Sequence, residues 1–173
     1  MIKKLLIANR SESAIRVIRT AAEMGIETLA IASEDDCSSL HMRQAGSAQI
    51  LNGRGPAAYL DADQIVRIAR KAGCDAIHPG YGFLSENAAF ARACAAAEVL
   101  FVGPTPAQLA MLGDKAAARL LAERCAVPVP AGTGGAVSLA EARQFMAELG
   151  RPVMIKALSR KRARRGESGL PNT

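Results

Sequence analysis

The chain has 173 residues, 50% of them hydrophobic and 22% charged, which is enough to bury one good core and to begin a second. No apolar run approaches the length that spans a membrane, and the short run after Met1 ends at Asn9-Arg10. We therefore expect neither a membrane segment nor a secretory signal. Four widely spaced cysteines lack the spacing of metal ligands and indicate reduced thiols in a soluble, cytoplasmic protein.

The formal net charge of +6 is concentrated in the last part of the sequence. Residues 158–173 contain five basic side chains and one acidic one, so they carry +4 of that charge. Nucleic-acid binding through this basic tail is one alternative function, but the tail has no aromatic side chain on which bases would stack. We expect neither a specific nucleic-acid partner nor a membrane partner.

The first hundred residues alternate short apolar runs with helical patterns, which predicts a Rossmann-like, doubly wound parallel sheet covered by helices on both faces. Ser85 is the predicted N-cap of the helix that begins at residue 88. In chain order, the predicted strands are 4–8, 28–32, 75–77 and 99–102, and the predicted helices are 12–24, 61–72 and 88–97.

A turn-rich break, Gly103-Pro104-Thr105-Pro106, closes this domain. Helices at 107–112 and 114–125 follow, and then a linker rich in proline and glycine. A helix at 139–149, capped by Ser138 and stopped by Gly150, leads into a predicted strand at 152–157. The predicted division is a Rossmann-like domain at 1–103, a helical linker at 104–135, the start of a second lobe at 136–157 and a disordered basic tail at 158–173.

The ten residues His78-Pro79-Gly80-Tyr81-Gly82-Phe83-Leu84-Ser85-Glu86-Asn87 lie between a predicted strand and a predicted helix. Open α/β sheets bind ligands at such glycine-rich turns, beyond the carboxyl ends of their strands. For Gly80 and Gly82 alone, a tight structural turn is an equal alternative. The candidate site residues in this segment are His78, Gly80, Tyr81, Gly82, Ser85, Glu86 and Asn87.

The loop after the first predicted strand is a second candidate site. It runs through Asn9, Arg10 and Glu12 and contains no glycine, so it does not fit the G-x-G-x-x-G pattern that NAD or FAD requires. By themselves Arg10 and Glu12 read as ordinary surface charges. The acidic run at 34–36 is better explained by a favourable interaction with a helix dipole than by a metal, so we assign no metal site.

Two lysines have positions that favour an anionic ligand. Lys115 lies at the start of the helix predicted at 114–125, directly after its predicted N-cap Asp114, where a cation does not favour the helix itself. Lys156 lies at the end of the strand predicted at 152–157. The alternatives are an exposed structural lysine at 115 and, at 156, a lysine whose stem packs while its ammonium reaches water.

These motifs together resemble the N-terminal domain of biotin carboxylase. The family carries HPGYGFLSEN, which residues 78–87 reproduce, and an A-N-R-x-E-x-A-x-R signature, which Asn9, Arg10, Glu12, Ala14 and Arg16 match. His41, which by itself would be an ordinary surface histidine, matches the family's histidine after a Ser-acidic segment. The family's G-D-K and I-K-A motifs match residues 113–115 and 155–157. The resemblance spans residues 3–157.

The resemblance implies a reaction in which MgATP activates bicarbonate as carboxyphosphate and biotin on a carrier protein is then carboxylated at N1′. It implies that 136–157 begin an ATP-grasp lobe and that Lys115 and Lys156 contact ATP, while it assigns no catalytic residue to this chain. The implied partners are a biotin carboxyl carrier protein, a carboxyltransferase and a second biotin carboxylase subunit. Two alternatives are open for this second subunit. It forms a homodimer with this chain, or it is a full-length subunit on which this chain docks, through Arg16 and Arg19, as a non-catalytic module.

The sequence also departs from the family. After residue 157 the family has a glycine-rich phosphate loop, whereas residues 158–166 contain one glycine and five basic side chains. We therefore expect a fragment that is inactive by itself and binds ATP weakly or not at all, and we hypothesise that 158–173 are read out of frame. Ser13 replaces an apolar helix residue of the family, at a cost if its hydroxyl is buried without a partner.

Overall fold

A computed structural model of the chain describes residues 1–155. Lys156 and the tail predicted at 158–173 therefore lie outside the described residues. The chain divides into two compact units, Met1–Gly113 and a second that begins at Asp114. The first unit extends ten residues beyond the break predicted at residue 103, because helix α6 (Pro106–Gly113) packs against α5 (Ala88–Ala96). The four-part division predicted from the sequence stays a prediction.

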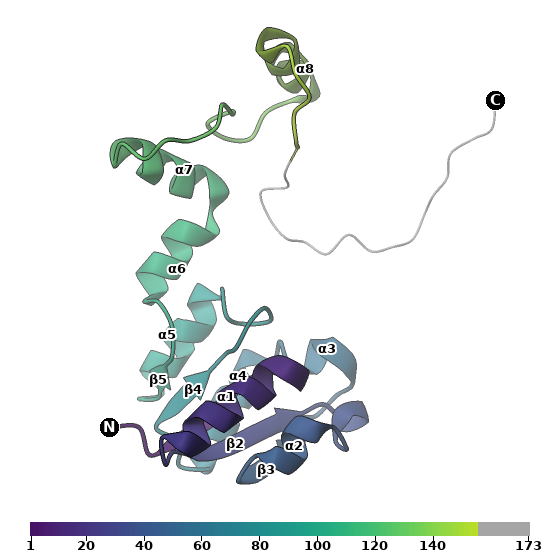
Figure 1. Cartoon of the computed structure of the whole chain (residues 1–173), viewed down its shortest axis with the longest axis vertical. Helices are drawn as coiled ribbons and strands as arrows, with labels where there is room; N and C mark the ends of the chain where they lie inside the picture. The colour runs from purple at the N-terminus through teal and green to yellow at the C-terminus, as the bar shows by residue number, and fades with distance from the viewer. Residues whose placement is uncertain (156–173) are drawn as a thin grey trace, which may run out of the picture. The chain divides into compact units, whose positions relative to one another are not determined.

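The first unit is built on a five-stranded parallel sheet in the order β3-β2-β1-β4-β5 (Figure 1). This confirms the predicted parallel α/β class. The chain moves outward from β1 in one direction through β2 and β3, and in the other through β4 and β5. The order therefore reverses between β1 and β4, so this pair is the topological switch point. The strands are β1 (Lys4–Ile7), β2 (Glu27–Ala32), β3 (Ser47–Ile50), β4 (Ala76–His78) and β5 (Leu100–Phe101).

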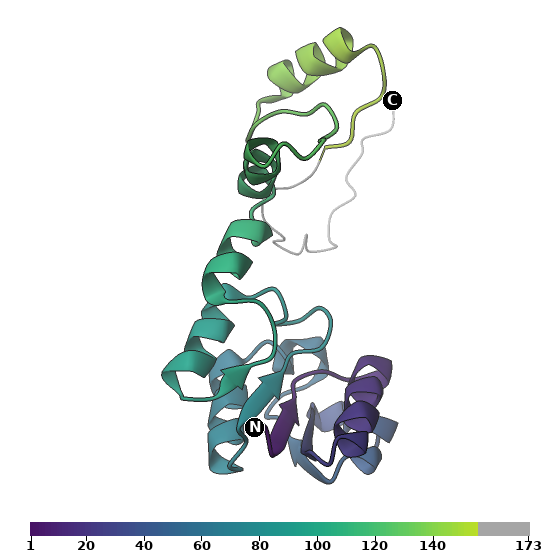
Figure 2. The same ribbon diagram turned by 60° about the vertical axis from the view of Figure 1, so that its left-hand side comes forward.

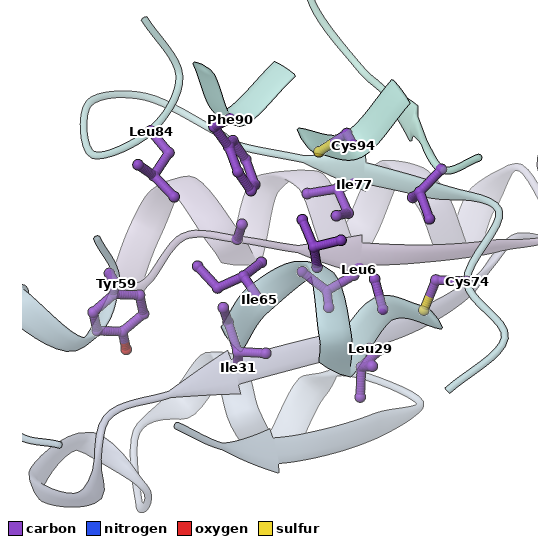
Figure 3. Close-up of a cluster of buried hydrophobic side chains, with 14 of the residues drawn as sticks. Leu6, Leu29, Ile31, Tyr59, Ile65, Cys74, Ile77, Leu84, Phe90 and Cys94 are labelled. Atoms are coloured by element: carbon purple, nitrogen blue, oxygen red, sulfur yellow. The ribbon is translucent and has the colours of Figure 1, made fainter. Parts of the chain in front are cut away.

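Alternation along the strands builds a separate core on each face of the sheet. Leu5 and Ile7 pack with α1 (Ser11–Glu23) and α2 (Leu40–Gln44) on one face. Leu6 lies on the opposite face with α4 (Ala62–Lys71) and α5, where Figure 3 shows Ile65, Ile77, Phe90 and Cys94 together between sheet and helices. Figure 2 shows the same two helical layers from another direction. The predicted doubly wound arrangement is thus confirmed.

Four short elements were not predicted. All four residues of β3 are exposed, so this edge strand has no alternation between buried and exposed side chains to reveal it. The 3-10 helix η1 (Glu34–Asp36), α2 and α3 (Gly55–Ala58) have between three and five residues each, too few to display a helical period.

One predicted helix cap is wrong. Asn87, and not Ser85, caps α5, because its Oδ1 accepts the N–H groups of Ala89 at 2.9 Å and Phe90 at 3.0 Å. Ser85 lies too early, in the preceding turn, where its own N–H donates to the Gly82 carbonyl. The concern about a buried hydroxyl at Ser13 is also removed, since Ser13 is only partly buried in α1.

The described part of the second unit contains α7 (Lys115–Arg124) and α8 (Leu139–Leu149). The predicted caps are confirmed: Asp114 accepts two amide N–H groups of α7, Ser138 and Glu141 form a capping box on α8, and Gly150 ends α8 in the left-handed region. The strand predicted from residue 152 is not formed over 152–155. A strand needs a neighbouring strand for its backbone hydrogen bonds, and residues 114–155 provide none.

Over residues 1–155, no helix is both long enough and apolar enough to cross a membrane.

Candidate functional site at the switch point of the sheet

Asn9 joins the two strands that flank the switch point. It follows β1, is only 3% exposed and uses every hydrogen-bonding atom of its amide. Its Nδ2 donates to the carbonyls of Pro79 at 2.8 Å and Tyr81 at 2.9 Å, and its Oδ1 accepts the Arg10 N–H at 3.0 Å. One side chain therefore holds the loop after β1 against residues 78–82, which begin at the last residue of β4. We call residues 78–82 the switch-point turn.

The switch-point turn is shaped by two glycines and one histidine. Gly80 and Gly82 have φ of +65° and +70°, a region that glycine enters at little cost. The Gly80 N–H donates to His78 Nδ1 at 3.0 Å, and burial lowers the pKa of the His78 imidazole. The ring is therefore set to remain neutral and act as an acceptor, while Tyr81 projects outward with 84% of its surface exposed.

An ion pair connects the end of β1 to the end of β2. Arg10 Nε lies 3.7 Å from Asp36 Oδ2, and the same oxygen accepts a hydrogen bond from the buried hydroxyl of Tyr59 at 3.2 Å. Burial, and then the charge of Asp36, raise the pKa of Tyr59 to about 12, so this hydroxyl stays a donor. The Arg10 side chain remains 37% exposed and is held at the carboxyl edge of the sheet, where ligands bind in this class of fold.

The neighbouring acidic side chains accept hydrogen bonds from backbone N–H groups. Glu34 Oε1 accepts the Gly53 N–H at 3.0 Å, and Asp35 Oδ1 accepts the Gly55 N–H at 2.8 Å. The hydrogen bond from Gly55 is the main reason why the pKa of Asp35 is lowered. Within residues 1–155, no group of three or more histidine, cysteine, aspartate or glutamate side chains is arranged to hold a metal ion.

The other predicted site residues of the first unit differ in how far they are buried. Glu12 is exposed in the first turn of α1, where a carboxylate interacts favourably with the helix dipole. Glu86 is exposed beyond the switch-point turn, Ser85 is half-buried beside it, and Asn87 is used as the cap of α5. The geometry thus brings Asn9, Arg10 and the switch-point turn together and leaves Glu12 and Glu86 at the surface.

Of the two predicted lysines, the structure describes Lys115, which belongs to the second unit. Lys115 is exposed on the first turn of α7, directly after its cap Asp114. Lys156 lies outside the described residues, so its predicted role stays a prediction.

His41 is a buried residue that its sequence position did not reveal. Its side chain is 0% exposed, with Nε2 3.1 Å from the Ile31 carbonyl of β2 and Nδ1 2.9 Å from Ser39 Oγ. A surface histidine was the ordinary expectation for a lone histidine on a short polar helix. The carbonyl that holds the ring belongs to a strand ten residues earlier, so only the fold brings the two together.

The first unit belongs to the doubly wound, Rossmann-like α/β class, and its polar side chains gather at the switch point of the sheet. Residues 1–109 match the family described as biotin carboxylase, N-terminal domain. The chain is 50% identical to pyruvate carboxylase from Staphylococcus aureus over 161 residues, and 48% identical to biotin carboxylase from Halalkalibacterium halodurans over 160 residues. The chain belongs to the biotin carboxylase N-terminal domain family.

The structure is also similar to a solved biotin carboxylase domain. The domain from Hydrogenobacter thermophilus 2-oxoglutarate carboxylase, a dimer in complex with MgADP, ADP and bicarbonate, has a TM-score of 0.84 and 40% identity over 88% of this chain. The alignment covers 34% of that domain, and the two curated relatives are covered over 14% and 35% of their lengths. The chain therefore corresponds to an N-terminal portion of a biotin carboxylase domain.

Proposed function

We propose that this chain supplies the N-terminal wall of the ligand cleft in a biotin carboxylase, which uses MgATP and bicarbonate to carboxylate biotin on a carrier protein. The observation that supports this most directly is that the hydrogen bonds of Asn9 join the loop after β1 to the switch-point turn. These bonds fix Arg10 and Tyr81 at the sheet edge where open α/β folds bind ligands. The MgADP and bicarbonate in the Hydrogenobacter domain agree with ligands of this chemistry.

In this proposal Lys115 and Lys156 contact the phosphates of ATP. The support for Lys115 is its exposure at the beginning of α7, where both the ammonium and the amino end of the helix carry positive charge. The nucleotide, when bound, supplies the phosphoryl group that activates bicarbonate. ATP-grasp architecture for the second unit, the carrier and carboxyltransferase partners and a cytoplasmic location belong to the same proposal.

We further propose that residues 1–173 do not catalyse this reaction by themselves. Residues 158–166 offer one glycine where the family has a glycine-rich phosphate loop, and arginine side chains do not reproduce the cradle of backbone N–H groups. The purified chain is expected to show no bicarbonate-dependent ATP hydrolysis above a blank without protein, under conditions in which the Halalkalibacterium halodurans enzyme turns over. Sustained turnover by the chain would refute this part of the proposal.

A second candidate function is a non-catalytic module that docks on an intact carboxylase subunit. Arg16 and Arg19 are both exposed on α1, about one turn apart, and the Hydrogenobacter domain is a dimer. Co-purification of the chain with a full-length carboxylase, abolished by charge reversal at Arg16 and Arg19, would support docking. Reversal of Arg67 and Arg70, which are exposed on α4, is the matched control and should leave co-purification unchanged.

A further inference from the structure

We infer that Asn9 is the positioning residue of the switch-point turn, and that position 80 is glycine because Asn9 fills the space a side chain would need. The inference uses the proposed function only to give the turn a ligand to face. An asparagine amide has two N–H donors and one acceptor oxygen, and Asn9 uses all of them on backbone atoms of the two loops. No other common side chain of this length combines two donors with an acceptor.

Gly80 lies directly against the Asn9 side chain. A Cβ added to Gly80 would lie 2.6 Å from Asn9 Nδ2 and 2.7 Å from Asn9 Cβ and Cγ. Asn9 is buried and held by three hydrogen bonds, so it has no room to withdraw. A Cβ added to Gly82 would meet nothing within 4 Å, although its φ is similar. The two glycines therefore differ in their contact with Asn9 and not in backbone strain.

Tyr81 is the side chain that this arrangement positions. Its carbonyl is bound by Asn9 while its ring is exposed, so the buried amide sets where the exposed aromatic ring stands at the sheet edge. Asn9 itself is buried, with 3% of its surface exposed. It acts through the backbone of the turn, and its role is to position rather than to react.

The first test is amide hydrogen exchange of the 173-residue chain carrying Asn9→Asp, which replaces two donors by a carboxylate facing two carbonyl oxygens. Asn52→Asp, the same change at an exposed position, is the matched control. We expect the Gly80 and Ser85 amides to lose their protection in Asn9→Asp, while α4 in the same unit stays protected and the control resembles the original chain. A folded Asn9→Asp chain in which the Gly80 and Ser85 amides both remain protected would overturn the inference.

If Asn9→Asp does not fold, a pair of glycine substitutions tests the inference instead. Gly80→Ala and Gly82→Ala introduce the same methyl group at similar positive φ, and only the first meets Asn9. We expect Gly80→Ala to lower the urea midpoint of unfolding clearly more than Gly82→Ala does. Equal midpoints for the two variants would overturn the inference. Neither measurement depends on ATP hydrolysis, so the positioning role and the proposed function fail or succeed separately.

Discussion

At the scale of single residues, the end of β1 combines a buried amide, an ion pair and a serine in a backbone region that favours glycine. Asn9 is fully hydrogen-bonded, Arg10 pairs with Asp36, and Ser11 has a φ of 53° at the beginning of α1. The first two features fix side chains at the ligand edge of the sheet. The third stores backbone strain beside them, since a side chain with a Cβ enters the left-handed region only at a cost.

Replacing Ser11 with glycine should therefore stabilise the chain. Glycine enters positive φ without the Cβ clash, so Ser11→Gly is expected to raise the free energy of unfolding by about 1 kcal/mol. Ser13→Gly is the matched control, because Ser13 lies within α1 and has no positive φ. There glycine should destabilise the helix by roughly 0.5 kcal/mol. Urea titrations of both variants measure the difference, and a loss of stability in Ser11→Gly would contradict the strain.

His78 should make the stability of the first unit depend on pH. Burial lowers its pKa below the ordinary value of 6.5, so protonation is easier in the unfolded state. The contribution of His78 to the free energy of unfolding is therefore fully present above pH 6.5 and is lost as the pH falls below it. His78→Asn supplies an acceptor for the Gly80 N–H but cannot titrate. Unfolding titrations between about pH 5 and pH 8 should show a shallower dependence in this variant; identical pH profiles would count against the role of His78.

At the scale of elements, the caps show which sequence signals identify a helix end. Asp114, Ser138 and Gly150 were predicted because each adjoins a clear helical pattern and has the expected residue type at the expected place. For α5 the sequence predicted Ser85 as the cap, whereas the structure has Asn87 there. Only the backbone of the preceding turn, in which the Ser85 N–H bonds back to Gly82, makes Asn87 the cap.

Removing the predicted cap Ser85 and the observed cap Asn87 in turn tests which residue stabilises the start of α5. Asn87→Ala removes an acceptor from two helix N–H groups and is expected to cost about 1 kcal/mol of stability. Ser85→Ala should cost at most a few tenths of a kcal/mol, because the residue is half-buried and its side chain caps nothing. Thermal or urea unfolding resolves the two values, and a larger loss in Ser85→Ala would contradict the assignment of the cap.

The strands and long helices of the first unit were predictable because each carries its own apolar pattern, as with Leu5 to Ile7 in β1 and Ile65 to Ala69 in α4. Exposed β3 carries no such pattern and was missed. The residues of the candidate site were predicted from their motifs, but the contacts between them could not be predicted. Asn9 forms hydrogen bonds with the carbonyls of residues 79 and 81, and His41 lies against the Ile31 carbonyl. These contacts join residues from different loops and strands, so no local sequence pattern predicts them.

At the scale of the whole molecule, the first unit should fold without the second. Both core clusters lie within Met1–Gly113, so a chain truncated after Gly113 is expected to unfold cooperatively, with an urea midpoint close to that of the full chain. Truncation after Gly103, the boundary predicted from the sequence, also removes Leu109 of α6, which is only 9% exposed. Losing that buried leucine should cost roughly 2 kcal/mol. Equal stability of the two truncated chains would contradict the boundary at Gly113.

We propose that residues 1–113 build the N-terminal wall of a biotin carboxylase cleft. The most direct test replaces the aligned segment of the Halalkalibacterium halodurans biotin carboxylase, 48% identical to this chain, with residues 1–113. We expect the chimaera to retain bicarbonate-dependent ATP hydrolysis within about tenfold of the parent, equal to roughly 1.4 kcal/mol of activation free energy. If the chimaera folds as cooperatively as its parent and yet shows no bicarbonate-dependent hydrolysis, residues 1–113 do not form this wall.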